Sequence, residues 1–279
     1  MTSESPIPGD IYLCQVSAEV SCAACCGLYN APDCSFEGLE KVLSDRSRRF
    51  ASLPRRAEDI SEFGRQVESG QVRKRPLADF HHCPFIGLIS SSRQQVGCLL
   101  HPLAEGNDGV DYRGLSYYGG MACRQYFCPS HRELAPYVKK IVRRLAVNWY
   151  EYGLIVTETA LLGALVSQVE KRLAAPLPQR GVLDTPAAYR VMREVLFLKI
   201  DWPYRRNNGR GLCHYFFSDR RYRKEPVDYG TAGRQPVEFD TIFAELTSRF
   251  NNVDEVRDAR QRLESLFQRA ADTLRRDSL

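Results

Sequence analysis

The chain has 279 residues, of which 43% are hydrophobic and 26% are charged, with a formal net charge of +5 at pH 7. This balance excludes an intrinsically disordered chain and a membrane protein, and the length allows one large domain or two ordinary ones. The basic excess is local, because residues 41–75 hold 10 basic and 5 acidic residues and residues 199–234 hold 9 and 4.

We expect no signal peptide, because residues 1–10 are polar, carry Glu4 and contain no long apolar stretch. A later apolar stretch, Leu154 to Val166, is interrupted by Glu158 and is shorter than the roughly 20 residues of a membrane-spanning helix. We therefore expect a cytoplasmic protein without a membrane partner. In a reducing compartment, clustered thiols point to metal binding or catalysis rather than to disulfides.

The first part of the chain, residues 1–132, holds nine of the ten cysteines. A weak alternation of apolar and polar residues over Ile11–Val16 predicts a short strand. Apolar residues at helical spacing predict one helix from Phe36 to Leu53, with Ser35 as its N-cap, and a second from Ile60 to Gly70.

Residues 81–128 are rich in glycine and serine, and Gly119-Gly120 is expected to form a turn rather than part of a regular element. We therefore expect residues 1–132 to form an irregular, cysteine-rich metal-binding region with little β structure. Residues 133–279 are expected to form a helical region, so the predicted fold class is mainly α.

The helical region begins with a capping-box signal, because Ser130 and Glu133 precede apolar residues that recur at helical intervals as far as Trp149. Thr157 is expected to begin a second helix that runs toward Ala174.

Thr185-Pro186 supplies an N-cap and a first-turn proline for a helix that we expect to reach Ile200. Two amphipathic helices are predicted at the C-terminal end, one marked by Phe239 to Phe250 and one by Val256 to Leu274.

The strongest functional signal is Cys22-Ala-Ala-Cys25-Cys26. A spacing of two residues lets a tight turn deliver two thiolates to one metal, at about 2.3 Å per zinc–sulfur bond. Adjacent cysteines do not readily point the same way, so the third thiolate either bridges two metals or serves a second one.

Four later cysteines complete a set of seven predicted ligands: Cys22, Cys25, Cys26, Cys83, Cys98, Cys123 and Cys128. A single tetrahedral site uses four ligands, so seven thiolates indicate spare thiols, two metals that share a thiolate, or an iron–sulfur cluster. His101 would be the eighth donor if no thiolate bridges, and Cys14 is a further candidate. We interpret Cys34 and Cys213 as small packing residues and the other histidines as surface or hydrogen-bonded residues.

These motifs resemble those of the YkgJ-type cysteine-cluster family, a zinc- or iron-chelating domain that opens with C-x-x-C-x-x-C-C. Residues 83–86 (CPFI) are similar to its C-x-F-L element, residues 97–102 (GCLLHP) to its C-I-Y segment, and residues 123–128 (CRQYFC) to its C-R-x-F-P-C. The resemblance covers about residues 14–132.

The chain departs from the family pattern at Glu19, which stands where the family has its first cysteine, and Cys14 is the candidate to replace that ligand. A second departure is an insertion of about twenty residues before the last motif. The resemblance implies metal chelation, with zinc, iron or an iron–sulfur cluster as the cofactor of a structural or redox centre.

An alternative function is an iron–sulfur-dependent enzyme that modifies proteins, since flagellin lysine methylases resemble this family in combining a cysteine cluster with helical sequence. No glycine-rich nucleotide loop follows a predicted strand, and no pair of carboxylates or Ser/His/Asp set can be assigned, so no catalytic residue is named.

A third interpretation is nucleic-acid binding through residues 199–234, where basic residues could neutralise phosphates while aromatic residues stack on bases. The aromatic residues concerned are Trp202, Tyr204, Tyr215, Phe216, Phe217, Tyr222 and Tyr229. We favour instead a solvated, arginine-rich loop with its aromatic side chains in the core. The expected partners are therefore a metal ion and a protein, rather than nucleic acid.

Overall fold

The computed structural model describes residues 7–70, 74–78, 80–90, 94–177, 183–205, 226–233 and 238–277. The chain folds as two compact units. The first comprises the residues up to Glu133 together with Ala146–Thr157, and the second comprises Leu134–Leu145 and the other described residues from Glu158 onward. The predicted division falls at residue 132, with one integrated domain as its alternative, and residues 146–157 cluster with the first unit.

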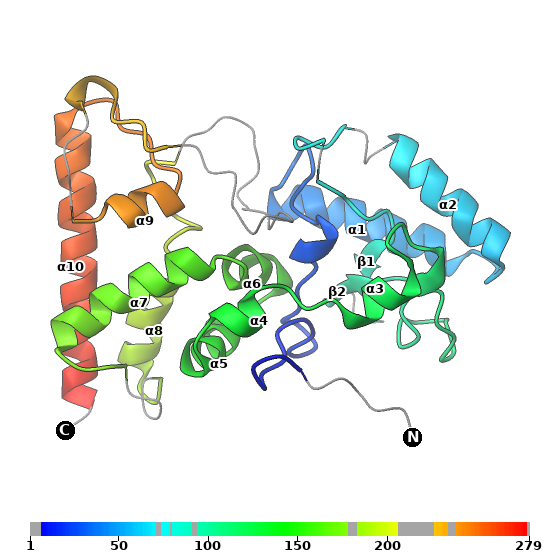
Figure 1. The fold of residues 1–279 in the computed structure, drawn as a ribbon, viewed down its shortest axis with the longest axis horizontal. Helices are drawn as coiled ribbons and strands as arrows, with labels where there is room; N and C mark the ends of the chain where they lie inside the picture. Colours follow the sequence, from blue (N-terminus) through cyan, green and yellow to red (C-terminus); the bar gives the residue numbers. More distant parts are fainter. Residues whose placement is uncertain are drawn as a thin grey trace. The chain divides into compact units, whose positions relative to one another are not determined.

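The first unit contains short helices, one two-stranded sheet and long connecting segments, and the described chain as a whole is mainly helical, as predicted (Figure 1). Its elements are the 3₁₀ turn η1 (Ala24–Cys26), α1 (Phe36–Ala51), α2 (Ala57–Gly70), β1 (Ile86–Leu88), β2 (Val96–Cys98), the 3₁₀ turn η3 (Arg113–Leu115), α3 (Gly119–Gln125), α4 (Ser130–Glu133) and α6 (Trp149–Val156).

Helix α1 begins where the sequence predicts, because the Ser35 hydroxyl accepts a hydrogen bond of 3.0 Å from the Gly38 N–H. Its apolar face is buried against α2 and against the β1–β2 hairpin. Between α1 and α2, the Phe50 and Phe63 rings meet edge to face with their centroids 5.4 Å apart. The two predicted helices of the first part are thus confirmed.

The segment 81–128 is more regular than the sequence predicts. Strands β1 and β2 pair antiparallel, with Ile86 opposite Cys98. A side chain on Gly87 would meet Leu99 and Ser47 at 2.7 Å, so this glycine allows the hairpin to lie close to α1. Gly119-Gly120 opens α3 instead of forming a separate turn.

The strand predicted over Ile11–Val16 is wrong, because only the isolated bridge between Gln15 and Ser21 forms there.

Helix α6 belongs to the first unit because three of its aromatic residues contact earlier segments. The Tyr29 hydroxyl donates to the Tyr150 carbonyl over 2.8 Å, and the Tyr152 hydroxyl donates to the Leu13 carbonyl over 2.9 Å. The Phe36 and Trp149 rings stack with centroids 5.5 Å apart. These contacts join the N-terminal cysteine segment to residues more than a hundred positions later.

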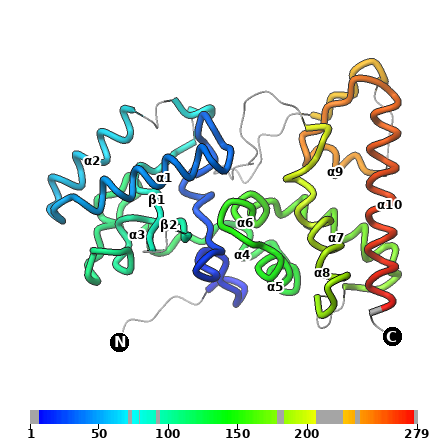
Figure 2. The backbone as a smooth tube through the Cα atoms, turned by 180° about the vertical axis from the view of Figure 1, so that it is seen from behind, coloured from blue at the N-terminus to red at the C-terminus, as the bar shows by residue number. Residues whose placement is uncertain are grey.

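The second unit is a helical assembly in which α10 lies alongside α7 and α8, as both views show (Figures 1 and 2). Its core consists of the apolar faces of these helices. Its elements are α5 (Pro136–Leu145), α7 (Thr159–Leu173), α8 (Pro186–Leu196), the 3₁₀ turn η4 (Gly230–Ala232), α9 (Asp240–Glu245) and α10 (Val253–Asp277).

One predicted helix is broken into three pieces. The expected helix from Ser130 to Trp149 becomes α4, α5 and the start of α6. The first break falls before Pro136, because this residue has no N–H with which to continue a preceding helix. Asn148 then caps α6 by accepting a hydrogen bond of 2.9 Å from Glu151 N–H.

Helix α8 starts as predicted, with the Thr185 hydroxyl accepting from Ala188 N–H at 3.1 Å, but it ends at Leu196 rather than at Ile200.

Within the described ranges, no single helix has the length and hydropathy needed to cross a membrane, and only α6 and α7 taken together as a bent pair reach that level.

Candidate metal centre

The first cysteine segment folds back on itself between Cys14 and Cys22. The Cys22 N–H donates a hydrogen bond of 2.7 Å to the Cys14 carbonyl, and the Val16 N–H donates to the Val20 carbonyl over 2.9 Å. The turn therefore places Cys14 beside the start of the Cys22-Ala-Ala-Cys25-Cys26 motif. Glu19, which stands where the family has its first cysteine, lies within this turn, and its side chain is exposed.

Cys25 and Cys26 lie in the 3₁₀ turn η1, which ends at Gly27 with φ at 81°. The Cβ of a side chain at Gly27 would lie 1.9 Å from the carbonyl oxygen of His81, so the backbone of the segment that precedes Cys83 packs directly against this turn. The Cys83 N–H donates a hydrogen bond of 2.8 Å to the Cys26 carbonyl. Cys83 is therefore held next to Cys26.

A buried arginine of α1 fixes the loop that carries Cys83. Arg46 lies 2.9 Å from His82 through its Nη2 atom, and because arginine only donates, the His82 Nε2 atom is the acceptor. The His82 Nδ1–H then donates to the Asn30 carbonyl over 3.1 Å. Burial, with the Arg46 charge adding to it, lowers the pKa of His82 to about 3, which keeps the imidazole neutral.

Cys98 ends strand β2 and is half-buried, close to the loop that holds Cys83. It pairs with Ile86 across the hairpin, and the next residue, Leu99, donates its N–H to the Phe85 carbonyl over 2.9 Å. The hairpin thus brings the segment that carries Cys83 and the segment that carries Cys98 to the same end of the sheet.

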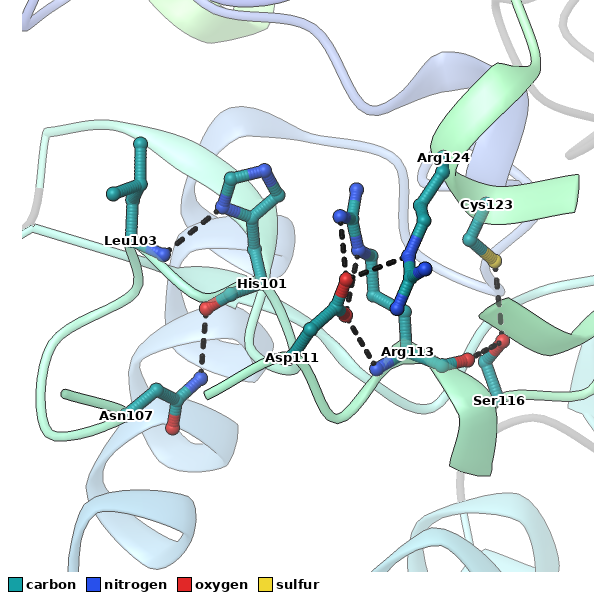
Figure 3. Close-up of polar contacts among 8 residues, drawn as sticks. All are labelled: His101, Leu103, Asn107, Asp111, Arg113, Ser116, Cys123 and Arg124. Carbon is teal, nitrogen blue, oxygen red and sulfur yellow. Dashed lines mark hydrogen bonds and ion pairs between the residues drawn. The ribbon is translucent and has the colours of Figure 1, made fainter. Parts of the chain in front are cut away.

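Cys123 lies on α3, and its thiol is 3.1 Å from the Ser116 hydroxyl (Figure 3). That hydroxyl donates to the Arg113 carbonyl over 2.8 Å, so the thiol is the donor toward Ser116. Arg113 and Arg124 both pair with the Asp111 carboxylate, at 2.8 and 2.7 Å. The hydrogen bond from Arg113 holds the pKa of Asp111 well below its usual range.

His101, the candidate eighth donor, makes hydrogen bonds within its own loop. Its Nδ1 atom accepts a hydrogen bond of 3.1 Å from Leu103 N–H, and its carbonyl accepts from the Asn107 side chain over 2.8 Å. The imidazole therefore shapes the 101–107 loop in the structure.

His131 was interpreted from the sequence only as a surface or hydrogen-bonded residue, yet it is fully buried beside Cys128. Its Nε2 atom accepts a hydrogen bond of 3.2 Å from Leu13 N–H. The neutral ring therefore carries its proton on Nδ1, which lies 3.6 Å from the Cys128 sulfur and donates to it. Only its position three residues after Cys128 could have indicated this role.

The electrostatic environment of the thiols reflects both burial and their mutual proximity. Burial raises the pKa of Cys83 to about 12 and the pKa values of Cys98 and Cys128 to about 11, and nearby thiolates add to each shift. The hydrogen bond from the Cys26 thiol lowers the pKa of Cys25. A bound cation would favour the thiolate form in such surroundings, because it replaces the proton.

The seven predicted ligands all lie in the first unit. As the side chains are oriented, no three His, Cys, Asp or Glu side chains of the described residues converge on one point in the manner of a formed metal site. The nine described cysteines all carry free thiols. The donor set suits zinc, iron and iron–sulfur clusters, which soft thiolate ligands select, and a change of χ1 rotamer moves a cysteine sulfur by about 3 Å.

Two cysteines were interpreted as packing residues. The Cys34 thiol donates to the Tyr29 and Ala31 carbonyls, at 2.8 and 3.2 Å, and it packs against the core of the first unit. Cys213 lies outside the described residues.

Three aromatic residues of the segment 199–234 are described, and they pack inside the second unit. The Trp202 indole N–H donates to the Ser248 hydroxyl over 2.9 Å, and the Tyr204 and Tyr229 rings both contact the Phe250 ring. The remaining aromatic residues of that segment, Tyr215, Phe216, Phe217 and Tyr222, lie outside the described residues.

Comparison with protein-family models, with curated proteins and with solved structures finds no match to this chain.

Proposed function

We propose that this protein binds zinc or iron, the latter as an ion or an iron–sulfur cluster, through the cysteines of its first unit. The supporting observation is that cysteines from four sequence motifs lie in one unit, where backbone and imidazole hydrogen bonds hold several of their segments together. The Cys83 N–H bonds to the Cys26 carbonyl, and Cys98 lies on the hairpin that follows Cys83.

The surrounding structure also suits a metal centre. Cys128 accepts a hydrogen bond from a buried imidazole whose other nitrogen is fixed by the Leu13 backbone. Hydrogen bonds of this kind orient metal ligands and adjust their basicity. His131 and the Arg46–His82 pair would hold the ligand-bearing segments in place.

The bound group would supply either folding energy or electron transfer. A structural zinc ion contributes about 10 to 16 kcal/mol of apparent binding free energy, enough to order segments with few regular elements. Residues 99–128 contain only η3 and α3, so they depend on contacts outside regular structure. An iron–sulfur cluster would make the same thiolates part of a redox centre.

Anaerobic purification followed by metal and acid-labile sulfide analysis, with a visible absorption spectrum, tests this proposal. Zinc without sulfide identifies a zinc site, whereas stoichiometric iron with sulfide identifies a cluster. A protein that contains neither metal contradicts the proposal. The Cys34→Ser variant is the matched control, because the Cys34 thiol donates to two backbone carbonyls and its loss should not change the metal content.

The second candidate function is an iron–sulfur-dependent enzyme that modifies a protein. The observation that favours it is a group of exposed large side chains on and around α3, next to the last cysteine motif. Tyr117 is 75% exposed, Met121 is 74% exposed, and Tyr126 is 54% exposed. Aromatic residues and methionine are enriched in surfaces that bind proteins.

Transfer of a methyl group to a lysine tests this second candidate. The iron-containing protein is incubated with a sulfonium methyl donor and a lysine-bearing polypeptide, and mass spectrometry detects the methyl group gained by the lysine nitrogen. The Cys25→Ser variant should lose both the cluster and the activity. Activity in an iron-free variant would sink this candidate.

A further inference from the structure

Two cysteines of the first unit are each followed, three residues later, by a histidine. Cys98 precedes His101 and Cys128 precedes His131, so both pairs have the spacing Cys-x-x-His. The pairs also share a backbone contact, because the histidine N–H donates to the cysteine carbonyl over 3.0 Å in the first pair and 3.1 Å in the second. Neither the spacing nor the local backbone therefore distinguishes the two histidines.

The two imidazoles turn to different partners. The His101 ring is half-buried and accepts a hydrogen bond from Leu103 N–H within its own loop. The His131 ring is fully buried, and its Nδ1 atom lies 3.6 Å from the Cys128 sulfur. His131 is therefore the histidine of this spacing whose ring is bonded to the sulfur of a candidate ligand.

The contact with Leu13 decides how His131 can act. The Leu13 N–H donates to the Nε2 atom over 3.2 Å, so Nε2 carries no proton. The proton of the neutral ring is then on Nδ1, which faces the sulfur as a donor. A metal bound at Nδ1 would move that proton to Nε2, where it would oppose the Leu13 N–H. His131 is thus suited to donate to a ligand and is not itself a ligand.

Both sides of this contact are held in place by further groups. The Leu13 carbonyl accepts a hydrogen bond of 2.9 Å from the Tyr152 hydroxyl, and Leu13 is 1% exposed. The Phe127 and His131 rings meet edge to face, with their centroids 4.9 Å apart. Rotation of the imidazole away from Cys128 would break the bond to Leu13, so the Nδ1–H direction is fixed by the fold.

We propose, on the basis of the proposed metal-binding function, that His131 is a positioning residue that donates a hydrogen bond to the metal-bound thiolate of Cys128. This bond strengthens metal binding, because a hydrogen bond to a charged acceptor is stronger than one to a neutral acceptor and orients the ligand. In an iron or iron–sulfur centre it also raises the reduction potential, because it stabilises the more negative reduced state. The role concerns one ligand and holds whichever other thiolates complete the centre.

The position of the ring proton is measured first, on the wild-type chain. Nitrogen-15 NMR of the zinc-loaded protein should show that His131 is protonated at Nδ1 and unprotonated at Nε2. Protonation at Nε2 instead overturns the proposal, because the ring would have no proton to donate to Cys128. This measurement needs no substitution, so it does not depend on whether a variant folds.

Two substitutions separate the two bonds of the ring. In His131→Asn the amide nitrogen takes the place of Nδ1 and can still donate to Cys128. In His131→Gln the amide oxygen takes the place of Nε2 and can still accept from Leu13, but the donor to the sulfur is lost. We expect His131→Gln to weaken zinc binding by about 10- to 100-fold in competition with a chelator, and His131→Asn to stay closer to the wild type.

A spectroscopic signature separates this role from a merely structural one. In the cobalt(II)-substituted chain, the sulfur-to-metal charge-transfer band should move to longer wavelength in His131→Gln, because a thiolate that lacks its hydrogen-bond donor releases electron density more readily. The band should stay in place in His131→Asn. If the chain contains iron, its reduction potential should fall in His131→Gln and not in His131→Asn.

His101→Gln is the matched control, because His101 has the same spacing from a cysteine but bonds to Leu103, and both readouts should be unchanged. Equal effects of His131→Gln and His131→Asn overturn the role of His131 while leaving metal binding intact. A His131→Gln variant with the wild-type affinity and spectrum does the same. A wild-type chain that binds neither zinc nor iron overturns the proposed function itself.

Discussion

Arg46 donates a hydrogen bond of 2.9 Å to the Nε2 atom of His82, so a buried charge on α1 holds the residue next to Cys83. The same guanidinium reaches the Cys83 carbonyl over 3.4 Å. The position of a candidate ligand therefore depends on a side chain from a helix that carries no cysteine.

Replacing Arg46 should weaken the first unit. Arg46→Met keeps much of the volume but leaves the His82 nitrogen without this donor, and we expect a loss of about 2 kcal/mol in the free energy of unfolding. Arg48→Met is the control, because Arg48 is exposed on the same helix and should change stability by less than about 0.5 kcal/mol. Urea unfolding measures both, and equal effects would contradict the role given to Arg46.

Gly27→Ala should disrupt the contact between the turn that carries Cys25 and Cys26 and the segment that precedes Cys83. An added Cβ would lie 1.9 Å from the His81 carbonyl oxygen, in a backbone conformation with φ at 81°. We expect a loss of more than about 3 kcal/mol together with reduced metal content.

The matched control is Gly109→Ala, where φ is 82° but no atom lies within 4 Å of the added Cβ. It should cost only about 1 kcal/mol, from the backbone conformation alone. If the two variants are equally stable, the close approach at Gly27 is not a constraint.

In the second unit, the ion pair between Lys199 and Glu158 should be sensitive to removal of one partner. The two side chains are 4% and 0% exposed, with the charged atoms 2.7 Å apart. Lys199→Met should cost about 3 to 5 kcal/mol, because a buried carboxylate loses its ion-pair partner. The double variant Lys199→Met/Glu158→Leu should recover part of that loss.

An exposed pair serves as the comparison. Lys171 and Glu238 are also close, at 2.6 Å, but their side chains are 66% and 40% exposed. Lys171→Met should cost less than about 1 kcal/mol when its thermal unfolding is measured beside that of the Lys199 variants. A cost as large as that of Lys199→Met would show that burial does not decide the difference.

Asp111 should contribute to the acid dependence of stability. Its pKa is lowered in the folded state by Arg113, so the folded state binds fewer protons than the unfolded state over the acid range. The stabilisation is therefore complete above the unfolded pKa of about 4 and is lost as the pH falls below it.

At pH 7 we expect Asp111→Asn to be less stable than the wild type by about 1 kcal/mol, and the difference should shrink as the pH falls below about 4. Denaturant unfolding at a series of pH values measures it, with Glu105→Gln as an exposed control on the preceding loop. A difference that does not change with pH would mean that the carboxylate charge is not responsible.

Metal removal should act on the first unit selectively. Chelation is expected to reduce amide hydrogen-exchange protection in α1 and in the β1–β2 hairpin, because the ligands hold these segments together. Helices α8 and α10, which lie in the second unit, should keep their protection. Uniform loss of protection in both units would contradict a metal site confined to the first.

Local signals predicted much of the fold. Ser35 and Thr185 cap their helices as expected, because a cap is a contact between residues three apart. Part of the failure at residues 130–149 came from Pro136, whose missing N–H outweighs the apolar periodicity around it and separates α4 from α5. The hairpin was missed because its strands are three residues each and contain glycine.

The candidate site was predictable only as a set of motifs. Spacing in the sequence identified seven cysteines and left Cys14 as a further candidate, and only the structure shows the backbone bond that holds Cys14 beside Cys22. The contacts of His131 with Leu13 and of Arg46 with His82 join residues far apart in the chain, so no local pattern could indicate them.

The bond from the Tyr29 hydroxyl to the Tyr150 carbonyl also limits how the chain can be divided. The polypeptide leaves the first unit after Glu133, returns at Ala146 and leaves again after Thr157. A fragment cut at residue 133 would lack α6, and both the Leu13 carbonyl and the Tyr29 hydroxyl would lose bonds that they make within the fold. The cysteine-bearing unit is therefore completed only after the ribosome has added a helix that belongs to the other unit.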